Sequence, residues 1–383
     1  MKIALLGYGT VGSGTAECLR NHPMEGVDLA KVLDKRKIDE IKEILTDNID
    51  DILNDGTIET VVEVMGGEEP AYTFVKSALL KGKNVVSANK LMLSRHYNEL
   101  VNLAREKNLS LSFSAAAGGS IPWLFNLIRA KRVDNILNVG GVMNGTTNFI
   151  LDKMQTGDGA DFDKVLKEAQ AKGYAEADPT ADIDGLDVKA KIALSCDIAY
   201  SKMIDPDDIP ALGIRYVTKN DIDNFKAMGY NCRLIGRGEK IGDEVAVYVE
   251  PMLFKPDAAE YTLAGAGNII SYLGEKMGKQ SYFGLGAGKE PTGAAIVNDL
   301  YDIAAGISIF DMAQCVGKTK CRPELVCHEY YVRTNAEFDR SIVKETVGDN
   351  AFITKKISVA SMHELAQKII ADGKEIFAAS IAE

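Results

Sequence analysis

The sequence lacks long hydrophobic runs, closely spaced pairs of cysteines and any block of basic residues. No stretch of about eighteen apolar residues occurs, and glycines interrupt the apolar start "MKIALLGYGTVG", so we expect neither a membrane span nor a signal peptide. The 6 cysteines are scattered without a C-x-x-C pair or a zinc pattern, which predicts reduced thiols in a cytoplasmic protein. The net charge of -11 and the absence of a basic cluster argue against a nucleic-acid partner. What is left is an ordinary globular chain of 383 residues, long enough for two or three domains.

The first apolar segment ends in a glycine turn that is typical of dinucleotide binding. "KIALLGYGTVGSGTAECLRNH" predicts a short strand, a turn with the pattern G-x-G-x-x-G, and a helix. The first glycine permits the tight turn, the second lets the backbone approach a pyrophosphate, and the third lets helix and strand pack closely. An acid also ends the next predicted strand, "VDLAKVL", where a ribose ligand is expected. The alternative is a tight structural turn. The expected cofactor contacts here are Gly7, Gly9, Thr10, Val11, Gly12 and Asp34.

Strands and helices continue to alternate through the first third of the chain. "ETVVEVMGG" and "NVVSANK" predict buried strands, and "AYTFVKSALLKGK" and "HYNELVNLAREKN" predict helices, as in a doubly wound parallel sheet. Ligands of such sheets bind at the carboxyl ends of the strands, where Gly66, Ser87 and Lys90 fall. A lone lysine is more often a surface residue beside a helix. The place of Lys90 after a buried strand favours a functional role.

An acidic stretch, "GYAEADPTADIDGLDVKAK" at residues 173–191, precedes the apolar segment "IALSCDIAY". Pro179 interrupts any helix through it, and Asp184, Asp187 and Lys191 share one face of the helix that follows. A dehydrogenase acting on a carbonyl needs a proton donor, which a lysine can be, and carboxylates suit a substrate that carries an ammonium group. The alternative is that the acids complement the helix dipole, which explains residues beyond the first turn poorly. The 4 histidines lie outside these clusters.

Blocks of the chain from residue 3 to about 305 resemble homoserine dehydrogenases, in the family's order. They are "GYGTVGSG", "VVEVMGG", "NVVSANK", "AAAGGSIP", "MNGTTNFIL", "AKGYAEADPTADIDGLDVKAKIAL" and "FGLGAGKEPTGAAIVNDLYDIA". The resemblance implies an NAD(P)-dependent enzyme that interconverts L-homoserine and L-aspartate 4-semialdehyde, on the route to threonine, isoleucine and methionine. It also implies a homodimer.

The resemblance assigns roles to single residues. Lys191 would be the proton donor and acceptor, and Asp182 would line the site. Glu176 and Asp187 would hold the amino-acid substrate, while Lys90 would lie near cofactor and substrate. Further expected site residues are Asn144 and Thr146, in the polar turn "NGTTN", for the substrate, and Gly173 and Gly286 near the nicotinamide.

One departure from the family concerns a monovalent-cation site. The family carries an acid where this chain has Ser114. Ala117, Gly119 and Ile121 would still offer backbone carbonyls, so the resemblance implies a Na+ site that lacks the family's acidic residue.

Two signals conflict over the choice of cofactor. Asp34 suits the ribose hydroxyls of NAD, whereas Lys35 and Arg36 suit the 2′-phosphate of NADP. We expect NADP to be used alongside NAD. Two other functions are the alternatives: another Rossmann-fold amino-acid dehydrogenase, which would not share "NGTTNFIL", and a non-catalytic NAD(P) sensor, which would lack a site residue.

The predicted fold class is α/β, in three parts. Residues 1–140, with a helix returning at about 293–320, form a Rossmann-type dinucleotide-binding domain, and residues 141–285 form an α+β substrate-binding and dimerisation domain. The tail, residues 325–383, predicts the order β-α-β-α-β, with "FDRSIVKETVG" as its first helix, and is similar to a truncated ACT domain. Such a tail would either support the fold or dimer, or bind an end-product amino acid such as threonine.

Overall fold

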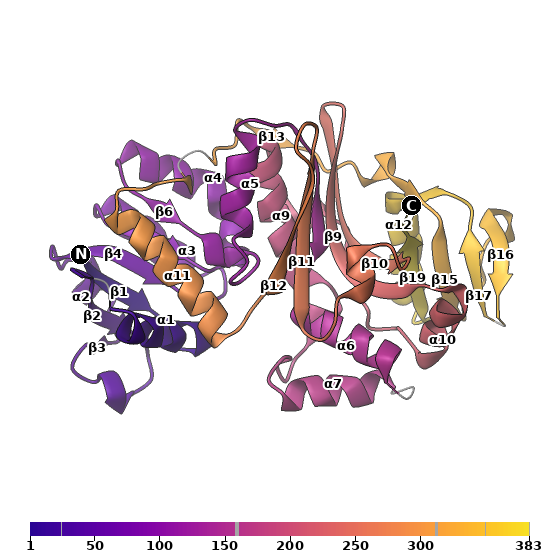
Figure 1. Cartoon of the computed structure of the whole chain (residues 1–383), viewed down its shortest axis with the longest axis horizontal. Helices are drawn as coiled ribbons and strands as arrows, with labels where there is room; N and C mark the ends of the chain where they lie inside the picture. Colours follow the sequence, from indigo (N-terminus) through magenta and orange to yellow (C-terminus); the bar gives the residue numbers. More distant parts are fainter. Residues whose placement is uncertain (24, 158–160, 311–312, 349, 383) are drawn as a thin grey trace. The chain divides into compact units, whose positions relative to one another are not determined.

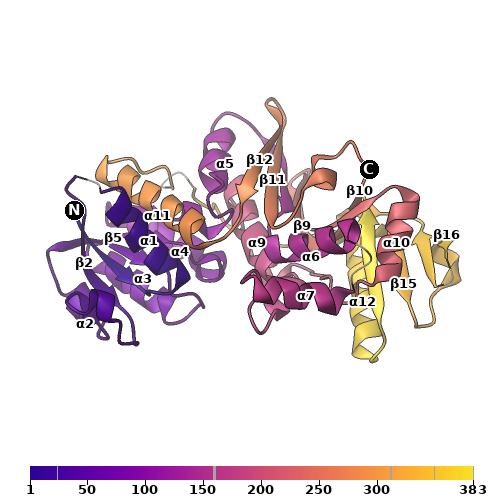
Figure 2. The same ribbon diagram turned by 60° about the horizontal axis from the view of Figure 1, so that its bottom comes forward.

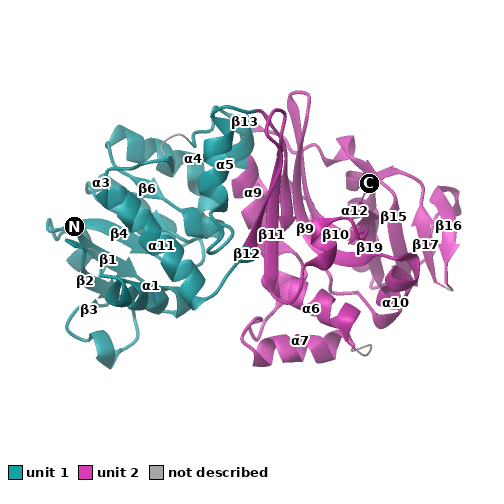
Figure 3. Ribbon diagram, viewed as in Figure 1, with its two compact units in different colours: residues 1–134, 197–203, 284–318 teal, residues 135–196, 204–283, 319–383 magenta. Residues whose placement is uncertain are grey.

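The computed structural model describes the chain except residues 24, 158–160, 311–312, 349 and 383. Two compact units are present (Figure 3). Unit 1 comprises residues 1–134, 197–203 and 284–318. Unit 2 comprises residues 135–196, 204–283 and 319–383. Within the described part of the chain, none of the helices combines the length and apolar character needed to cross a bilayer.

Unit 1 is built on a six-stranded parallel sheet, which confirms the fold predicted from the alternation of strands and helices. The strands are β1 (Lys2–Leu6), β2 (Asp28–Leu33), β3 (Leu45–Thr46), β4 (Ile58–Glu63), β5 (Asn84–Ser87) and β6 (Leu111–Ser112). Their order is β3-β2-β1-β4-β5-β6. The chain therefore moves outward from β1 in one direction and from β4 in the other, and such a switch point is where doubly wound sheets bind ligands.

Helices complete unit 1 (Figure 1). They are α1 (Thr10–Asn21), α2 (Asp50–Leu53), α3 (Ala71–Leu80), α4 (Lys90–Glu106), α5 (Trp123–Lys131) and α11 (Lys289–Ala304). Helix α11 packs closely on α1 through two glycines. A Cβ on Gly14 would lie 2.3 Å from the Lys289 carbonyl oxygen, and one on Gly293 would lie 2.7 Å from the Gly14 carbonyl carbon. The late segment thereby joins the core of the first strand, with Ile296 and Leu300 buried in the same cluster as Ile3.

Unit 2 contains a nine-stranded sheet, which is mixed. Its main strands are β7 (Ile136–Val142), β9 (Asn231–Ile241), β10 (Glu244–Phe254), β11 (Gly267–Gly274), β12 (Gly278–Leu285), β15 (Tyr330–Thr334), β16 (Val343–Val347), β17 (Ala351–Thr354) and β19 (Ile376–Ile381). The order is β12-β11-β7-β9-β10-β19-β15-β17-β16. Neighbours run antiparallel in the described pairs, except that β10 and β19 are parallel.

Helices complete unit 2, and two of them carry predicted substrate residues. The elements are α6 (Gly145–Thr156), α7 (Phe162–Ala171), α8 (Thr180–Ile183), α9 (Leu186–Tyr200), α10 (Lys219–Met228) and α12 (Val359–Ala371). Short strands are β8 (Met203–Ile204), β13 (Lys318–Thr319), β14 (Cys327–His328) and β18 (Ile357–Ser358). Helices α6 and α7 lie side by side (Figures 1 and 2). Helix α9 crosses β9 closely, since a Cβ on Gly236 would lie 2.8 Å from Val188 Cγ1.

The tail corrects one element predicted from the sequence. "FDRSIVKETVG" was expected to form a helix, but it forms a short 3-10 turn, Arg340–Ile342, followed by strand β16. Pairing with β17 overrides the weak helical pattern, because β-branched residues such as Val343 and Val347 fit a strand well. The observed order is β15-β16-β17-α12-β19 apart from short elements, and these strands continue the unit 2 sheet. A separate ACT-like domain stays a prediction.

Candidate active site

The glycine turn of unit 1 has the geometry that a pyrophosphate requires. Gly7 has φ 101°, a left-handed conformation that glycine adopts without strain. A Cβ on Gly12 would lie 2.1 Å from Gly7 O, so only glycine lets α1 approach the turn. At Gly9, by contrast, no atom lies within 4 Å of the Cβ position, and φ is -76°. Gly9 is the N-cap of α1 and offers no side chain, so the helix end next to Thr10 and Val11 can receive an anion.

Asp34 follows β2 and is already surrounded by donors. Its Oδ2 accepts from Tyr8 N at 2.9 Å and from Arg36 Nη2 at 2.8 Å, and its Oδ1 accepts from Arg36 N and Nε at 3.0 Å. These bonds from Arg36 hold the pKa of Asp34 well below its usual range. The side chain of Arg36 is 62% exposed and that of Asp34 is 10% exposed. The pair therefore presents both a carboxylate and an exposed cation beside the expected ribose position.

The other predicted cofactor residues of unit 1 lie at the carboxyl edge of β4 and β5. Gly66 follows β4 with φ 77°, Ser87 ends β5, and Lys90 is the first residue of α4. Sequence reasoning missed the residue beneath them, Glu63, whose carboxylate accepts from Ser87 Oγ at 2.6 Å. Its signal was available: an acid stands inside the apolar run "VVEVM".

The predicted cation loop is engaged by protein groups. Ser114 donates from N and Oγ to the carboxylate of Asp299, at 3.0 and 2.7 Å, and burial raises the pKa of Asp299 to about 7. The Ile121 carbonyl accepts from Trp123 N at 2.6 Å. Ser114 therefore does not take over the role of the family's acidic residue, because its hydroxyl donates a hydrogen bond to Asp299. The Na+ site, with Ala117 and Gly119 as further ligands, stays a prediction and no reaction step is assigned to an ion.

Gly286 lies at the same loop of unit 1. A Cβ on Gly119 would lie 2.6 Å from the Gly286 carbonyl carbon, so the two backbones touch. Ser120 adds hydrogen bonds from N and Oγ to Leu285 O, at 3.3 and 3.2 Å. The segment that was expected near the nicotinamide is therefore held against residues 118–121.

In unit 2, Lys191 is a buried lysine fixed by two oxygens. Its Nζ donates to Asp187 Oδ2 at 2.8 Å, one helical turn earlier on α9, and to Met143 O at 2.7 Å at the end of β7. Asp187 lies in the first turn of α9, because the helix begins at Leu186 and not at Asp184. The helix dipole therefore accounts for the placement of Asp187 better than the sequence suggested. It does not account for the bonds that Asp187 makes.

Asn144 joins the acidic stretch to the lysine. It is the N-cap of α6, with Oδ1 accepting from Thr147 N at 2.8 Å. Its Nδ2 donates to Asp182 Oδ1 at 2.7 Å and to Asp187 Oδ2 at 2.8 Å. Four predicted site residues, Asn144, Asp182, Asp187 and Lys191, are thus brought into one hydrogen-bonded network.

Glu176 is not joined to this network. Its side chain is exposed on the loop after α7, and in the described part of the chain no hydrogen bond of its carboxylate is present. The loop itself is tied to α6, because Thr146 Oγ1 donates to Tyr174 O at 2.6 Å. Gly173 opens the loop with φ 73°. The structure therefore places Glu176 on an exposed loop of the same unit that is tied to α6, and its role in binding stays a prediction.

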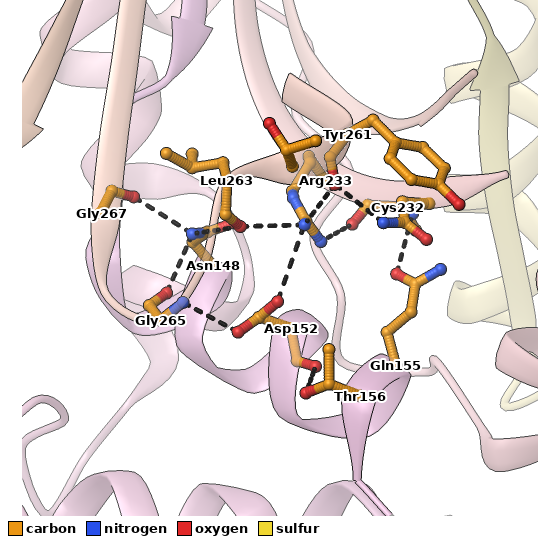
Figure 4. A network of polar contacts seen from close by, with 12 residues as sticks. Asn148, Asp152, Gln155, Thr156, Cys232, Arg233, Tyr261, Leu263, Gly265 and Gly267 are labelled. Carbon is orange, nitrogen blue, oxygen red and sulfur yellow. Dashed lines mark hydrogen bonds and ion pairs between the residues drawn. The ribbon is translucent and has the colours of Figure 1, made fainter. Parts of the chain in front are cut away.

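A second network, which sequence reasoning missed, supports α6 from behind (Figure 4). Arg233 is 1% exposed, and its guanidinium donates to the carbonyls of Tyr261 and Leu263 and lies 3.8 Å from Asp152 Oδ1. Asn148 Nδ2 donates to Gly265 O at 2.9 Å. These bonds hold the loop before β11 onto α6, the helix whose N-cap is Asn144. Nothing in "NCRLIGRGE" distinguishes this arginine from a surface one.

Comparison with known proteins finds one family. The family model "Homoserine dehydrogenase" matches residues 122–301, and "Homoserine dehydrogenase, NAD binding domain" matches residues 7–114. The homoserine dehydrogenase of Bacillus subtilis is 36% identical over 312 residues, which cover 78% of this chain and 72% of that protein. That of Mycobacterium leprae is 32% identical and covers 97% of this chain and 87% of that protein.

Solved structures agree with these matches. A homoserine dehydrogenase from Thiobacillus denitrificans has a TM-score of 0.87 at 30% identity, covering 100% of this chain and 98% of that chain. A hyperthermophilic archaeal homoserine dehydrogenase in complex with NADPH has a TM-score of 0.68 at 26% identity, over 80% of this chain and 98% of that chain. Since both the sequence and the fold match across the two units, the chain belongs to the homoserine dehydrogenase family and is an NAD(P)-dependent oxidoreductase that interconverts L-homoserine and L-aspartate 4-semialdehyde.

Proposed function

We propose that Lys191 is the proton donor and acceptor of this reaction. The observation that carries the proposal is its buried ammonium, aimed by Asp187 Oδ2 and Met143 O at 2.8 and 2.7 Å. The nicotinamide, when bound, supplies or accepts the hydride. In reduction, Lys191 protonates the carbonyl oxygen of L-aspartate 4-semialdehyde. In oxidation, it accepts the hydroxyl proton of L-homoserine.

The acids of unit 2 bind the substrate's ammonium group in this proposal. Asp187 and Glu176 supply the carboxylates, and Asp182 lines the same site through its bond to Asn144. Asn144 Nδ2 donates to both aspartates, and this shared donor offsets part of their mutual repulsion.

The substrate's α-carboxylate needs donors instead of acids. The Asn144 cap satisfies Thr147 N, whereas the first N–H groups of a helix, here those of Gly145 and Thr146, have no partner inside it. An N-terminus of this kind suits a carboxylate. We assign the substrate carboxylate to this end of α6.

The test compares Lys191→Ala with Lys189→Ala, a matched change on another face of α9. Absorbance at 340 nm follows the reaction with homoserine and each cofactor. Loss of general acid–base help should lower kcat by about 100- to 10,000-fold in Lys191→Ala and leave cofactor binding intact. Lys189→Ala should keep wild-type kcat. If Lys191→Ala also keeps it, the assignment is wrong and Lys90 becomes the candidate.

For the cofactor we favour NADP alongside NAD. The Arg36 guanidinium pairs with Asp34 and is exposed, so it can turn to a 2′-phosphate and leave Asp34 to the ribose. The variant Arg36→Ala should lower kcat/KM for NADP by about tenfold or more, through loss of a charge-assisted hydrogen bond, and spare NAD. A wild-type kcat/KM at least tenfold better with NAD would contradict this preference.

We also assign a cytoplasmic homodimer. The cysteines are free in the described residues, as a reducing compartment would keep them.

For the dimer, the candidate surface is the face of the unit 2 sheet that is turned away from α9. Ile235 and Arg237 flank Gly236, which faces α9, so they point to the opposite face of the sheet. There they line a cavity of about 200 Å³ with Phe254 and Leu273. Light scattering of the wild type measures the mass, and a monomeric wild type would contradict the dimer.

A further inference from the structure

Glu63 is a fully buried carboxylate at the end of β4, and it has no part in the reaction described so far. It is 0% exposed, among apolar neighbours such as Val61 and Val62. Burying a charged group costs free energy unless hydrogen bonds compensate for the lost water. The partners of Glu63 therefore show what its carboxylate is for.

Donors from two separate segments meet this carboxylate. Oε1 accepts from Met65 N at 2.8 Å and from Asn89 Nδ2 at 3.3 Å, and Oε2 accepts from Ser87 Oγ at 2.6 Å. Asn89 Nδ2 also donates to Gly67 O at 2.6 Å. Burial raises the pKa of Glu63, and these hydrogen bonds oppose that rise.

The same bonds reach the start of α4. Asn89 Oδ1 accepts from Met92 N at 3.1 Å and so caps the helix that begins at Lys90. Asn89 N donates to Ser87 Oγ at 3.1 Å. One carboxylate thus links the loop after β4 with the end of β5 and the first turn of α4.

The loop that Glu63 holds contains two consecutive glycines. Gly66 and Gly67 have φ of 77° and 75°, and glycine pairs have the largest backbone freedom to lose. The loop lies at the carboxyl edge of the sheet, beside the switch point between β1 and β4. Order in this loop is therefore most useful to a ligand bound at this edge.

A buried lysine offers the contrast. Lys83 is 3% exposed, and its Nζ donates to Asp55 O at 2.7 Å and Ile58 O at 2.8 Å. It is a satisfied buried charge on the same pair of strands, but at their amino ends, where doubly wound sheets do not bind ligands. Lys83 should serve the fold alone.

We infer that Glu63 is a positioning residue for the nicotinamide cofactor. Its carboxylate holds the Gly66–Gly67 loop and the Ser87–Lys90 segment in a fixed relation, so that the cofactor meets an ordered edge. This inference rests on the proposed cofactor residues Gly66, Ser87 and Lys90.

The experiment measures the Kd of NADPH and NADH by fluorescence for Glu63→Gln, with Lys83→Met as the control. The Gln side chain keeps the shape of Glu, but one of its two acceptor oxygens is replaced by an NH2 group. That NH2 group then faces a hydrogen-bond donor of the protein. The cofactor Kd should rise by about tenfold or more. The KM for homoserine, and kcat at saturating cofactor, should change far less than Kd. Lys83→Met should lower Tm while its Kd stays at the wild-type value.

Three outcomes overturn the inference. In the first, the cofactor Kd of Glu63→Gln stays within twofold of wild type while Gly9→Ala weakens binding. The cofactor site is then correct, but Glu63 does not position the cofactor. Another is an unchanged Kd in both variants, which removes the proposed cofactor site itself. The third is an equal rise of Kd in Lys83→Met, which means general loss of stability. If Glu63→Gln does not fold, Glu63→Asp, which keeps the charge and shortens its reach, must show the raised Kd.

Discussion

At the scale of single residues, two glycines of the same turn serve different ends. Gly12 is required by packing, because a Cβ there would lie 2.1 Å from Gly7 O. A Cβ on Gly9 would have no atom within 4 Å, so packing does not require glycine there, and the open space is available to a ligand. Gly9→Ala should keep Tm near wild type, because its backbone angles suit any residue, yet raise the Kd of the cofactor by placing a methyl group in the path of the pyrophosphate. Gly12→Ala should lower Tm itself. Thermal melts and cofactor titration separate the two effects, and an unchanged Kd in Gly9→Ala would contradict the pyrophosphate position.

Asp299 makes a prediction about pH. Burial raises its pKa from 3.8 to about 7 in the folded protein, so the folded state holds this proton more tightly than the unfolded chain does. Its contribution to stability is present below about pH 4 and is lost as pH rises toward 7, at about 1.4 kcal/mol for each pKa unit. In Asp299→Asn this loss disappears. Urea unfolding between pH 4 and 8 should show wild type weakening relative to the variant, and parallel curves would show that Asp299 does not titrate there.

At the scale of elements, the loop after α7 and helix α9 differ in how many hydrogen bonds fix the side chains of their site residues. Glu176 lies on an exposed loop, whereas Asp187 lies on α9 and bonds to Lys191 and Asn144. Glu176→Gln should therefore raise the KM for homoserine with little change in Tm, and Asp187→Asn should raise KM and lower Tm. Steady-state kinetics, with homoserine and cofactor varied in turn, give the KM values, and thermal melts give Tm. An equal rise in KM for homoserine and for cofactor would indicate a folding defect instead.

Local patterns predicted some elements well. The turn before α1 and the alternation of unit 1 could be read from glycine spacing and apolar runs, because those signals come from neighbouring residues. The bonds from Asn144 to Asp182 and Asp187 could not, since they join residues about forty positions apart across three elements. Strand β16 was mistaken for a helix because its character comes from pairing with β17. Arg233 was missed because only burial distinguishes it.

At the scale of the whole molecule, the tail is part of the sheet that carries the substrate residues. Strand β19 lies between β10 and β15, with Met252 opposite Ser380. A chain ending near Leu325 would expose the end of β10 at Met252 and Leu253 and leave Glu250 without His363 and Tyr330, its buried partners at 2.9 and 3.1 Å. We expect that chain to aggregate or remain unfolded, as circular dichroism and gel filtration would show. A folded, active truncated enzyme would contradict this.

The same placement favours a supporting role for the tail over a sensory one. Residues 338–348, where the sequence predicted the first tail helix, form a short 3-10 turn and strand β16 instead. Millimolar threonine should therefore leave activity and Tm of the full chain unchanged. A shift in either would restore the alternative that the tail binds an end-product amino acid.

The position of β19 also has a consequence for the order of events at the ribosome. Both of its neighbours, β10 and β15, are translated earlier, and synthesis proceeds at about 5–20 residues per second. Until residues 376–381 emerge, the two halves of this sheet have no common strand between them. During that interval the end of β10 at Met252 and Leu253 lacks its partner strand, and an unpaired strand edge promotes association with other chains, so binding of chaperones during translation would protect this protein.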